Sequence, residues 1–345
     1  MAAASLSELP SLAPHPPLRD SHGRVIHDLR VSITDRCNYK CIYCRTGEAG
    51  AQYPELGNEE YLRIVELFVS LGITKVRLTG GEPLLRRRVV DLVKELARMR
   101  TLAGAPLDLA LTTNGHLLES LAQPLKDAGL NRVTVSMDAV DAATFERITR
   151  VEGSFANVLA GIRAARAAGL TPLKINCVLL RGFNDDQIEG FARFAREEDV
   201  VVRFIEFMPL EEGRLWSPEI VVTLNEIVER ISKTMPLVEL PLRESSETAR
   251  RYTFADRVGE IGIIAPVSQA FCGACSRVRL TSDGKIRTCL FSQVEHDLYG
   301  RLRTGTSDAE LRSYIVRTVL EKEARHHIGE PGFLKPSRSM VHIGG

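Results

Sequence analysis

Residues 37–44 read CNYKCIYC and place Cys37, Cys41 and Cys44 in a Cys-x3-Cys-x2-Cys triplet. The triplet directly follows an apolar, strand-like run at residues 30–35. A structural zinc site usually takes four protein ligands, whereas a cubane 4Fe–4S cluster held by three thiolates leaves one iron open for a small molecule. The spacing therefore favours an iron–sulfur site. A zinc site completed by a distant ligand, or three unrelated buried cysteines, stays open as an alternative.

The composition is that of a soluble globular protein. The chain has 345 residues, of which 44% are hydrophobic and 26% charged, enough for one large domain with an extension. A formal charge of +1 provides no global attraction to nucleic acid or to a membrane surface, so we expect neither partner. No signal peptide is visible, and six of the seven cysteines fall in two tight groups. This usage predicts metal binding in the reducing cytoplasm rather than a disulfide framework.

Apolar, β-branched runs alternate with helical periodicity along the first 210 residues. The expected strands lie at 30–34, 75–79, 107–112, 132–138, 172–179 and 200–207. The expected helices lie at 61–71, 89–99, 117–128, 155–168 and 187–195. Repeated βα units predict a parallel sheet, and six units are too few for a closed eight-stranded barrel. We therefore predict an α/β fold built on a partial (β/α)6 barrel, an incomplete TIM barrel; an open doubly wound sheet is the alternative.

Beyond residue 210 the pattern changes to that of an α+β extension. Helices are expected at 223–233 and 308–323, and strand pairs at 252–254 with 260–264 and at 277–281 with 285–288. Ser282, Asp283 and Gly284 supply the turn of the second pair. The predicted organisation is a flexible tail at 1–23, a barrel at 24–210, a cluster-binding extension at 211–330 and a C-terminal tail at 331–345.

Unusual residues occur where the expected strands end, which is where active-site residues of such barrels lie. The tetrapeptide GGEP at residues 80–83 follows the second strand, and its glycines let the backbone approach a ligand closely. Ser136 and Met208 stand at the ends of the fourth and sixth strands. GGEP alone is more often an ordinary turn, but its βα spacing from the cysteine triplet favours a ligand site.

A second cysteine triplet lies in FCGACSRVRLTSDGKIRTCLF, residues 271–291. Its members are Cys272, Cys275 and Cys289, and the predicted hairpin carries Cys289 back towards the other two. A fourth thiolate is again missing. Cys177, the remaining cysteine, lies in an apolar strand and is expected to be a core residue. A four-thiolate zinc site that recruits Cys177 is the alternative.

These motifs resemble those of the radical S-adenosylmethionine (SAM) superfamily, in which the open iron binds SAM. The two triplets, GGEP and the terminal Gly-Gly together are similar to those of the GTP 3′,8-cyclases, which begin molybdenum cofactor biosynthesis. The similarity extends from residue 24 to residue 345. Its most specific parts are DLRVSITDRCNYKCIYC (28–44), VRLTGGEPLLRR (76–87), residues 271–291 and PGFLKPSRSM (331–340).

The resemblance implies a reaction, its cofactors and its site residues. In that family a 5′-deoxyadenosyl radical removes hydrogen from C3′ of GTP, the C3′ radical adds to guanine C8, and reduction gives the 3′,8-cyclised dihydro-GTP. It implies a lyase with two 4Fe–4S clusters, the second of which binds substrate. The implied SAM contacts are Tyr43, Gly81, Ser136 and Met208. The implied GTP contacts are Arg30, Arg77, Thr112, Lys174, Arg277, Val278 and Arg279. The implied catalytic residues are Arg277, Arg279, Gly344 and Gly345.

The basic residues agree with that implication on physical grounds. A triphosphate needs several cations, and no Walker loop is present to bind one. Arginines inside barrel-facing strands would be costly to bury without an anionic partner, which favours ligand contact. The run at residues 86–88, by contrast, is expected to be a solvated surface charge cluster.

The family also implies partners. These are an external electron donor and a cyclic pyranopterin monophosphate synthase that acts downstream, with the chain as monomer or homodimer. Departures from the family pattern occur at Arg45, Thr46 and Ser276, at the rims of the two sites. Competing interpretations are a radical SAM peptide-modifying enzyme with an auxiliary cluster, and a non-enzymatic iron–sulfur sensor or zinc-stabilised nucleic-acid adaptor. The first would need more cysteines in the extension, and the second a basic face.

Overall fold

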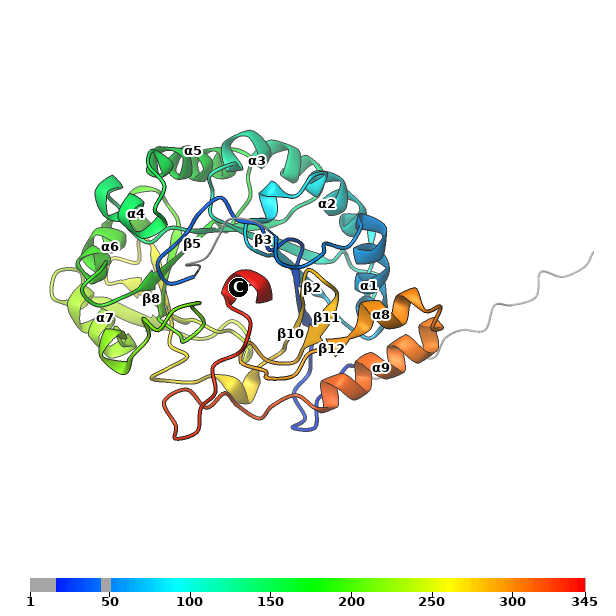
Figure 1. The fold of residues 1–345 in the computed structure, drawn as a ribbon. Helices are drawn as coiled ribbons and strands as arrows, with labels where there is room; N and C mark the ends of the chain where they lie inside the picture. Colours follow the sequence, from blue (N-terminus) through cyan, green and yellow to red (C-terminus); the bar gives the residue numbers. More distant parts are fainter. Residues whose placement is uncertain (1–16, 45–50, 345) are drawn as a thin grey trace, which may run out of the picture.

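The computed structural model describes residues 17–44 and 51–344 of the protein (Figure 1). Six parallel strands lie side by side in chain order. They are β1 (Asp28–Ser32), β2 (Lys75–Thr79), β3 (Asp108–Thr113), β4 (Arg132–Ser136), β5 (Lys174–Leu179) and β6 (Val201–Glu206). The sheet curves around a central space with the helices outside, so the predicted partial (β/α)6 barrel is confirmed.

The connecting helices follow the predicted order. They are α1 (Asn58–Ser70), α2 (Val89–Arg98), α3 (Leu118–Asp127), α4 (Ala142–Thr149), α5 (Ser154–Ala167), α6 (Ile188–Glu197) and α7 (Leu224–Ser232). Helix α4 was not predicted; it begins at Asp141, whose carboxylate accepts a hydrogen bond from the backbone N–H of Thr144. Short 3-10 turns are η1 (Pro83–Leu85), η2 (Asp185–Gln187), η3 (Pro218–Ile220) and η4 (Cys272–Ala274). None of the described helices has the length and apolar character needed to cross a lipid bilayer.

The extension adds strands to both edges of the barrel sheet. On one edge β9 (Glu260–Ile264) pairs parallel with β6, followed by antiparallel β8 (Arg250–Phe254) and β7 (Leu237–Leu240). On the other edge β10 (Arg277–Leu280) pairs parallel with β1, followed by antiparallel β11 (Lys285–Arg287) and β12 (His296–Asp297). Both predicted strand pairs are present, and the extension shares one continuous sheet with the barrel. Strands β7 and β12 were not predicted.

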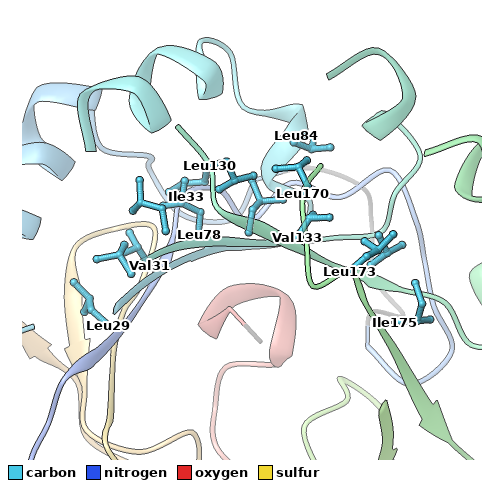
Figure 2. Close-up of a cluster of buried hydrophobic side chains, with 14 of the residues drawn as sticks. Leu29, Val31, Ile33, Leu78, Leu84, Leu130, Val133, Leu170, Leu173 and Ile175 are labelled. Atoms are coloured by element: carbon cyan, nitrogen blue, oxygen red, sulfur yellow. The ribbon is translucent and has the colours of Figure 1, made fainter. Parts of the chain in front are cut away.

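Successive side chains of each strand point alternately into the core and into the lumen of the barrel. Leu29, Val31, Val133 and Ile175 are buried on the face that packs against the helices. Figure 2 shows these side chains on the helix side of the strands, with the C-terminal helix on the opposite side. The lumen positions between them are polar or charged, for example Arg30 in β1. The sequence thus places its unusual residues inside the barrel.

The C-terminal segment returns to the barrel after α8 (Leu298–Arg303) and α9 (Asp308–Leu320), which lie outside it (Figure 1). The last turn, α10 (Met340–Ile343), lies inside the ring of strands. The N–H of Met340 donates to the carbonyl of Leu210 at 3.1 Å, and the N–H of Gly344 donates to the carbonyl of Met340 at 3.0 Å. The end of the described chain is therefore buried in the lumen.

Candidate active site

The first cysteine triplet follows β1 and lines a cavity of about 180 Å³ at the carboxyl ends of the strands. Cys37, Cys41 and Cys44 are partly buried. Burial, with the nearby Asp138 carboxylate, raises the pKa of the Cys41 thiol well above its usual value. Because a thiol must ionise to bind iron, positive metal centres are what would hold this group as a thiolate.

The two glycines of GGEP bring β2 against the residues that precede this triplet. The N–H of Gly81 donates to the carbonyl of Thr34 at 2.8 Å, and the N–H of Glu82 donates to the carbonyl of Arg36 at 2.7 Å. A Cβ at position 81 would overlap the carbonyl oxygen of Arg36. GGEP therefore fixes the backbone that leads into Cys37, a function that only glycine allows at this distance.

Glu82 ties the same segment to the end of β3. Its carboxylate accepts hydrogen bonds from the Thr113 hydroxyl at 2.7 Å and from the N–H groups of Asn114 at 2.6 Å and Leu84 at 2.9 Å. Complete burial nevertheless raises the pKa of Glu82 to about 7, against these bonds. No separate role was predicted for Glu82. Its position in a short turn after a buried strand is the only feature of the sequence that could have indicated these hydrogen bonds.

The predicted SAM contacts all line the first cavity: Tyr43, Gly81, Ser136 and Met208. The Tyr43 hydroxyl donates a 2.6 Å hydrogen bond to Oδ2 of Asp138, and the N–H of Val178 donates to Oδ1 at 2.9 Å. Burial raises the pKa of Asp138 to about 6. Asp138, just beyond β4, is a lining residue that the sequence analysis did not select.

The second triplet lines another cavity, of about 170 Å³, within the same lumen. Cys272 begins η4, Cys275 directly follows it, and Cys289 follows β11, so the hairpin does return the third thiol to the first two. Arg277 donates to Sγ of Cys275 at 3.4 Å. Burial opposes ionisation of Cys275, but Arg277 and Lys322 lower the pKa of its thiol to about 6.

The two cavities adjoin. Five residues line both of them: Thr112, Asn176, Ile205, Met208 and Met340. A molecule in one cavity would therefore lie next to a molecule in the other. Such contact is what a reaction between a SAM-derived radical and a substrate needs, since the reacting atoms must approach within about 3–3.5 Å.

Cys177 takes no part in either triplet. It is fully buried in β5 on the helix-facing side, within the hydrophobic core, and the Asn184 side-chain amide contacts its sulfur at 3.9 Å. The core prediction is confirmed, and the zinc site that recruits Cys177 is excluded.

Three arginines lie in register across neighbouring strands of the second cavity. Arg30 in β1 is the Cα partner of Arg279 in β10 on one side and of Arg77 in β2 on the other. Arg203 in β6 faces the same cavity and donates to Oδ1 of Asn176 at 3.0 Å. Burial and neighbouring guanidinium groups lower the pKa of Arg77 to about 10 and that of Arg203 to about 9, so both stay charged at neutral pH.

These cations lack protein anions in their cavity. No aspartate or glutamate is among the described residues that line it. The buried Nε of Arg30 has no hydrogen-bond partner in the described part of the chain. Asp28 and Glu247, which lie outside this cavity, offset part of the charge of Arg30 and Arg203. Burying several cations together is still expensive. The arrangement therefore favours an anionic ligand with several negative charges.

The other predicted substrate contacts occupy different places. Thr112 accepts a hydrogen bond from Arg77 at 3.3 Å and borders both cavities. Lys174 lies at the amino end of β5 in a third cavity, which shares Arg30, Arg77, Arg203 and Arg277 with the second. Burial, with Arg203, lowers the pKa of Lys174 to about 8. The side chain of Val278 packs in the hydrophobic core, which leaves its backbone for any ligand contact.

Two of the predicted catalytic residues, Arg279 and Gly344, meet at the end of the described tail. Arg279 donates a hydrogen bond to the carbonyl of Gly344. Gly344 has φ +78, and a Cβ there would overlap Oγ1 of Thr79. Gly345, Arg45 and Thr46 lie outside the described residues. Ser276, the other departure from the family pattern, is buried, and its carbonyl accepts from the N–H groups of His27 and Asp28 at 3.1 Å.

One expectation about charge was wrong, and two cations that line the second cavity were missed. Arg86 was expected in solvent, but it is 7% exposed and donates to the carbonyls of Ile33 and Leu56. Its place directly after η1 turns it inward. Arg203 was missed although it alternates within an expected strand as Arg30 and Arg77 do. Lys322 lines the second cavity and donates to the carbonyl of Thr288. It does not lie in an expected strand, so no sequence pattern indicated its position.

The cysteine triplets fit cubane clusters as donor sets. No three His, Cys, Asp or Glu side chains within residues 17–44 and 51–344 converge as the ligands of a single metal ion do. A cubane needs a looser arrangement, because each of its three thiolates binds a different iron atom. Three partly buried thiols around a cavity, with glycine backbone beside them, meet that requirement.

Comparison with family descriptions divides the chain into two segments. Residues 31–195 match the radical SAM superfamily. Residues 200–328 match the family described as Molybdenum Cofactor Synthesis C. The first segment contains one cysteine triplet and the second contains the other.

Individual proteins match over nearly the whole chain. The GTP 3′,8-cyclase of Moorella thermoacetica is 44% identical over 334 residues, which cover 95% of this chain and 100% of that protein. The GTP 3′,8-cyclase of Acidothermus cellulolyticus is 45% identical over 310 residues, 88% of this chain and 84% of that protein. The GTP 3′,8-cyclase of Xanthomonas axonopodis pv. citri is 45% identical over 295 residues, 84% of this chain and 87% of that protein.

Solved structures support the fold. Streptococcus suis SuiB bound to S-adenosylmethionine has a TM-score of 0.62 over 90% of this chain and 76% of that one, at 14% identity. SuiB bound to precursor peptide SuiA has a TM-score of 0.63 over 92% of this chain and 76% of that one, at 13% identity. At this level of identity the likeness concerns the fold alone.

Proposed function

Since the chain belongs to the GTP 3′,8-cyclase family, we propose that it is a radical SAM lyase that converts GTP into (8S)-3′,8-cyclo-7,8-dihydroguanosine 5′-triphosphate. This reaction is the first step of molybdenum cofactor biosynthesis. The proposal rests on the arrangement of residues in the lumen. Two cysteine triplets border adjoining cavities, and the second cavity is lined by several arginines and by no described aspartate or glutamate.

Each triplet would hold one 4Fe–4S cluster. Cys37, Cys41 and Cys44 would bind the first cluster, and Cys272, Cys275 and Cys289 the second. When bound, the first cluster with SAM supplies the 5′-deoxyadenosyl radical that removes hydrogen from C3′ of GTP, while the second offers an open iron to the guanine base.

The residues of the first cavity would bind and orient SAM. The Gly81 backbone lies beside the cysteine loop, and the hydroxyl groups of Tyr43 and Ser136 border the same space. Asp138 accepts the Tyr43 hydrogen bond and so fixes the ring next to Cys44. Met208 lies at the junction of the two cavities, where its apolar side chain helps to exclude water from the reacting atoms.

The residues of the second cavity would hold GTP. Arg30, Arg77 and Arg203 present guanidinium groups whose planar shape can grip two phosphate oxygens at once. Lys174 would extend this cationic surface into the third cavity, towards the amino ends of the strands. Arg277 and Arg279 lie nearer the second triplet, and Thr112 lies between the cavities. GTP would thus lie with its base at the second cluster and its ribose towards SAM.

Several partners belong to the proposal. Reduction of the first cluster requires an external electron donor, and a cyclic pyranopterin monophosphate synthase would take the product. The oxygen sensitivity of such clusters favours the cytoplasm. The chain would act as a monomer or homodimer without nucleic acid or membrane.

A radical SAM peptide-modifying enzyme is the principal rival, since SuiB has a similar fold. Two features of this chain disfavour a peptide substrate. The lumen is partly filled by the chain's own C-terminal turn, and the second cavity is cationic rather than suited to a neutral backbone.

The test is anaerobic reconstitution with iron and sulfide, followed by incubation with dithionite and SAM, with and without GTP. We expect about eight irons per chain, as two cubanes require. We also expect 5′-deoxyadenosine together with an isomer of GTP, both detected by mass spectrometry. SAM cleavage with GTP returned unchanged would favour a peptide substrate. Zinc in place of iron would contradict both the cyclase and the peptide-modifying enzyme.

A further inference from the structure

The C-terminal tail has an anchor that the proposed reaction does not explain. The guanidinium of Arg338 lies 3.8 Å from the ring centroid of Tyr53. Its Nη1 and Nη2 pair with the two carboxylate oxygens of Asp283 at 2.8 and 2.9 Å, and Nη2 also pairs with Glu295 at 2.8 Å. The side chain of Arg338 is 4% exposed and that of Asp283 is 8% exposed. Arg338 is part of PGFLKPSRSM, the tail motif singled out in the sequence.

One partner of Arg338, Asp283, belongs to the hairpin that also carries the predicted catalytic arginines. Asp283 lies in the turn between β10 and β11, four residues after Arg279. Arg279 in turn donates to the carbonyl of Gly344. The tail is therefore attached to one hairpin at two points, with α10 as the single turn between them. Since a helix rises about 1.5 Å per residue, this turn is a short and stiff connection.

We propose that Arg338 is a positioning residue that fixes the tail so that Gly344 reaches Arg279 in the lumen. It acts through the tail and does not itself line the SAM or GTP cavity. The role assigned to Gly344 and Arg279 rests on the proposed function. The attachment of the tail rests on the contacts of Arg338 alone.

The other polar contacts of the tail are less extensive than this one. Lys335 pairs with Glu211 at 2.9 Å, but the Lys335 side chain is 32% exposed. Ile343 adds apolar packing against Leu210 and Phe291. The N–H of Met340 makes one backbone hydrogen bond, to Leu210. Arg338 combines two charge-assisted bonds to Asp283, another to Glu295 and aromatic stacking in a buried setting. Among the described tail contacts it makes the most extensive attachment.

Removal of Arg338 would leave the hairpin with compensated charges. Lys285 lies 3.6 Å from both Asp283 and Glu295, and Arg287 pairs with Glu295 at 2.7 Å. Neither carboxylate would become an isolated buried charge, which is the usual reason that breaking such a pair unfolds its surroundings. The loss should therefore be confined to the tail.

The experiment is hydrogen exchange on the anaerobically reconstituted protein without GTP. The amides of His342 and Gly344 donate hydrogen bonds within the tail, and the amide of Met340 donates to the carbonyl of Leu210. In Arg338→Ala we expect these amides to exchange at least about tenfold faster, because local opening controls their exchange. Arg338→Lys should be intermediate, since an ammonium group cannot make the two-pronged bond. Arg325→Ala, which removes only an exposed ion pair with Glu330, is the control and should leave exchange unchanged.

A second measurement separates positioning from general damage. Arg338→Ala should keep its iron content and its GTP-independent SAM cleavage, while the ratio of 5′-deoxyadenosine to cyclised GTP rises. Unchanged tail exchange in Arg338→Ala would overturn the proposal whatever its activity. Loss of iron would also overturn it, because Arg338 would then support the hairpin as a whole. If the tail loosens but the wild-type protein never cyclises GTP, the attachment stands and the proposed function fails.

Discussion

Arg279 donates a hydrogen bond to the carbonyl of Gly344, a residue 65 positions further along the chain. Both groups are buried inside the barrel, and the bond joins the last described residue to the strand beside the second cysteine triplet. The tail thus borders the space in which GTP is proposed to bind. Its fit there depends on the absence of a side chain at position 344.

Gly344→Ala should impair cyclisation more than it impairs folding. The added methyl group would overlap Oγ1 of Thr79, and φ +78 is unfavourable for alanine. The tail must then withdraw, and a displacement of about 1 Å in an active site can reduce turnover about 100-fold. We expect such a loss in cyclised GTP, with iron content unchanged, measured by anaerobic assay and iron analysis.

Gly329→Ala is the matched control for backbone strain. Gly329 has φ +80, close to that of Gly344, but a Cβ there would meet no atom within 4 Å. The Gly329→Ala variant should therefore have the same cost of placing alanine at a positive φ, without the steric overlap. We expect it to keep near-wild-type turnover. Equal losses in the two variants would show that crowding in the lumen is not the cause.

Arg203→Met should weaken GTP binding without weakening the fold. The substitution removes a partly buried cation that lines a cavity without described carboxylates, and it keeps most of the side-chain volume. We expect KM for GTP to rise at least about tenfold, as loss of one charge-assisted contact of about 1.4 kcal/mol would produce. The urea midpoint of the GTP-free protein should be unchanged or higher.

The control for this substitution is Arg163→Met on the outer surface. Arg163 is 61% exposed and pairs with Glu198 at 3.3 Å, far from any cavity-lining set described above. KM should not change in this variant. A KM for Arg203→Met within twofold of wild type would rule out a phosphate contact for Arg203.

The two cysteine triplets should be separable by substitution. Cys44→Ala removes a ligand of the first triplet and should abolish SAM cleavage with or without GTP. Cys289→Ala affects only the second triplet, so SAM cleavage should persist while cyclised GTP disappears. Each variant should lose about four irons, as one cubane requires. If Cys289→Ala also fails to cleave SAM although its first cluster is intact by spectroscopy, the assignment of separate roles is wrong.

Glu82 should make the free energy of unfolding fall as pH rises. Burial raises the pKa of its carboxyl from the ordinary value of 4.5 to about 7, so the folded protein binds this proton more tightly than the unfolded chain. Folding favours the protonated carboxyl of Glu82. Its contribution to the free energy of unfolding is therefore complete below pH 4.5 and is lost as the pH rises from 4.5 to about 7. The loss is on the order of 3 kcal/mol.

Urea unfolding of the wild type and of Glu82→Gln at about pH 5 and about pH 8 tests this dependence. Glu82→Gln is expected to be less stable at both values, because its amide cannot accept all three hydrogen bonds. The difference between the two pH values should nevertheless shrink in the variant. An identical pH dependence in both proteins would show that another group is responsible.

Local periodicity predicted the barrel because each βα unit has its own sequence signature. The strand and helix runs from residue 30 to residue 207 were recognised except for helix α4, and parallel neighbours follow from their order. The pairing of β9 with β6 and of β10 with β1 could not be predicted in this way. Those contacts join segments that are far apart in the sequence, and the sequence of a strand does not indicate with which other strand it pairs.

The candidate site was predictable where residue type and spacing were unusual. The cysteines and GGEP were selected on that basis, and Arg30 through the family resemblance; the cysteines of both triplets, Gly80, Gly81 and Arg30 line the lumen. No role was predicted for Asp138, or for Glu82 apart from its motif, because a carboxylate after a strand is common and only burial makes it distinctive. Arg338 was quoted within a motif but had no predicted role, since its partner Asp283 lies 55 residues away.

The most direct test of the central claim uses GTP that carries deuterium at C3′. The adjoining cavities place the proposed SAM site beside the proposed ribose site. We predict that the reconstituted enzyme transfers deuterium into 5′-deoxyadenosine and releases a cyclised isomer of GTP that lacks it. 5′-Deoxyadenosine without deuterium, formed alongside unchanged GTP, would contradict the account.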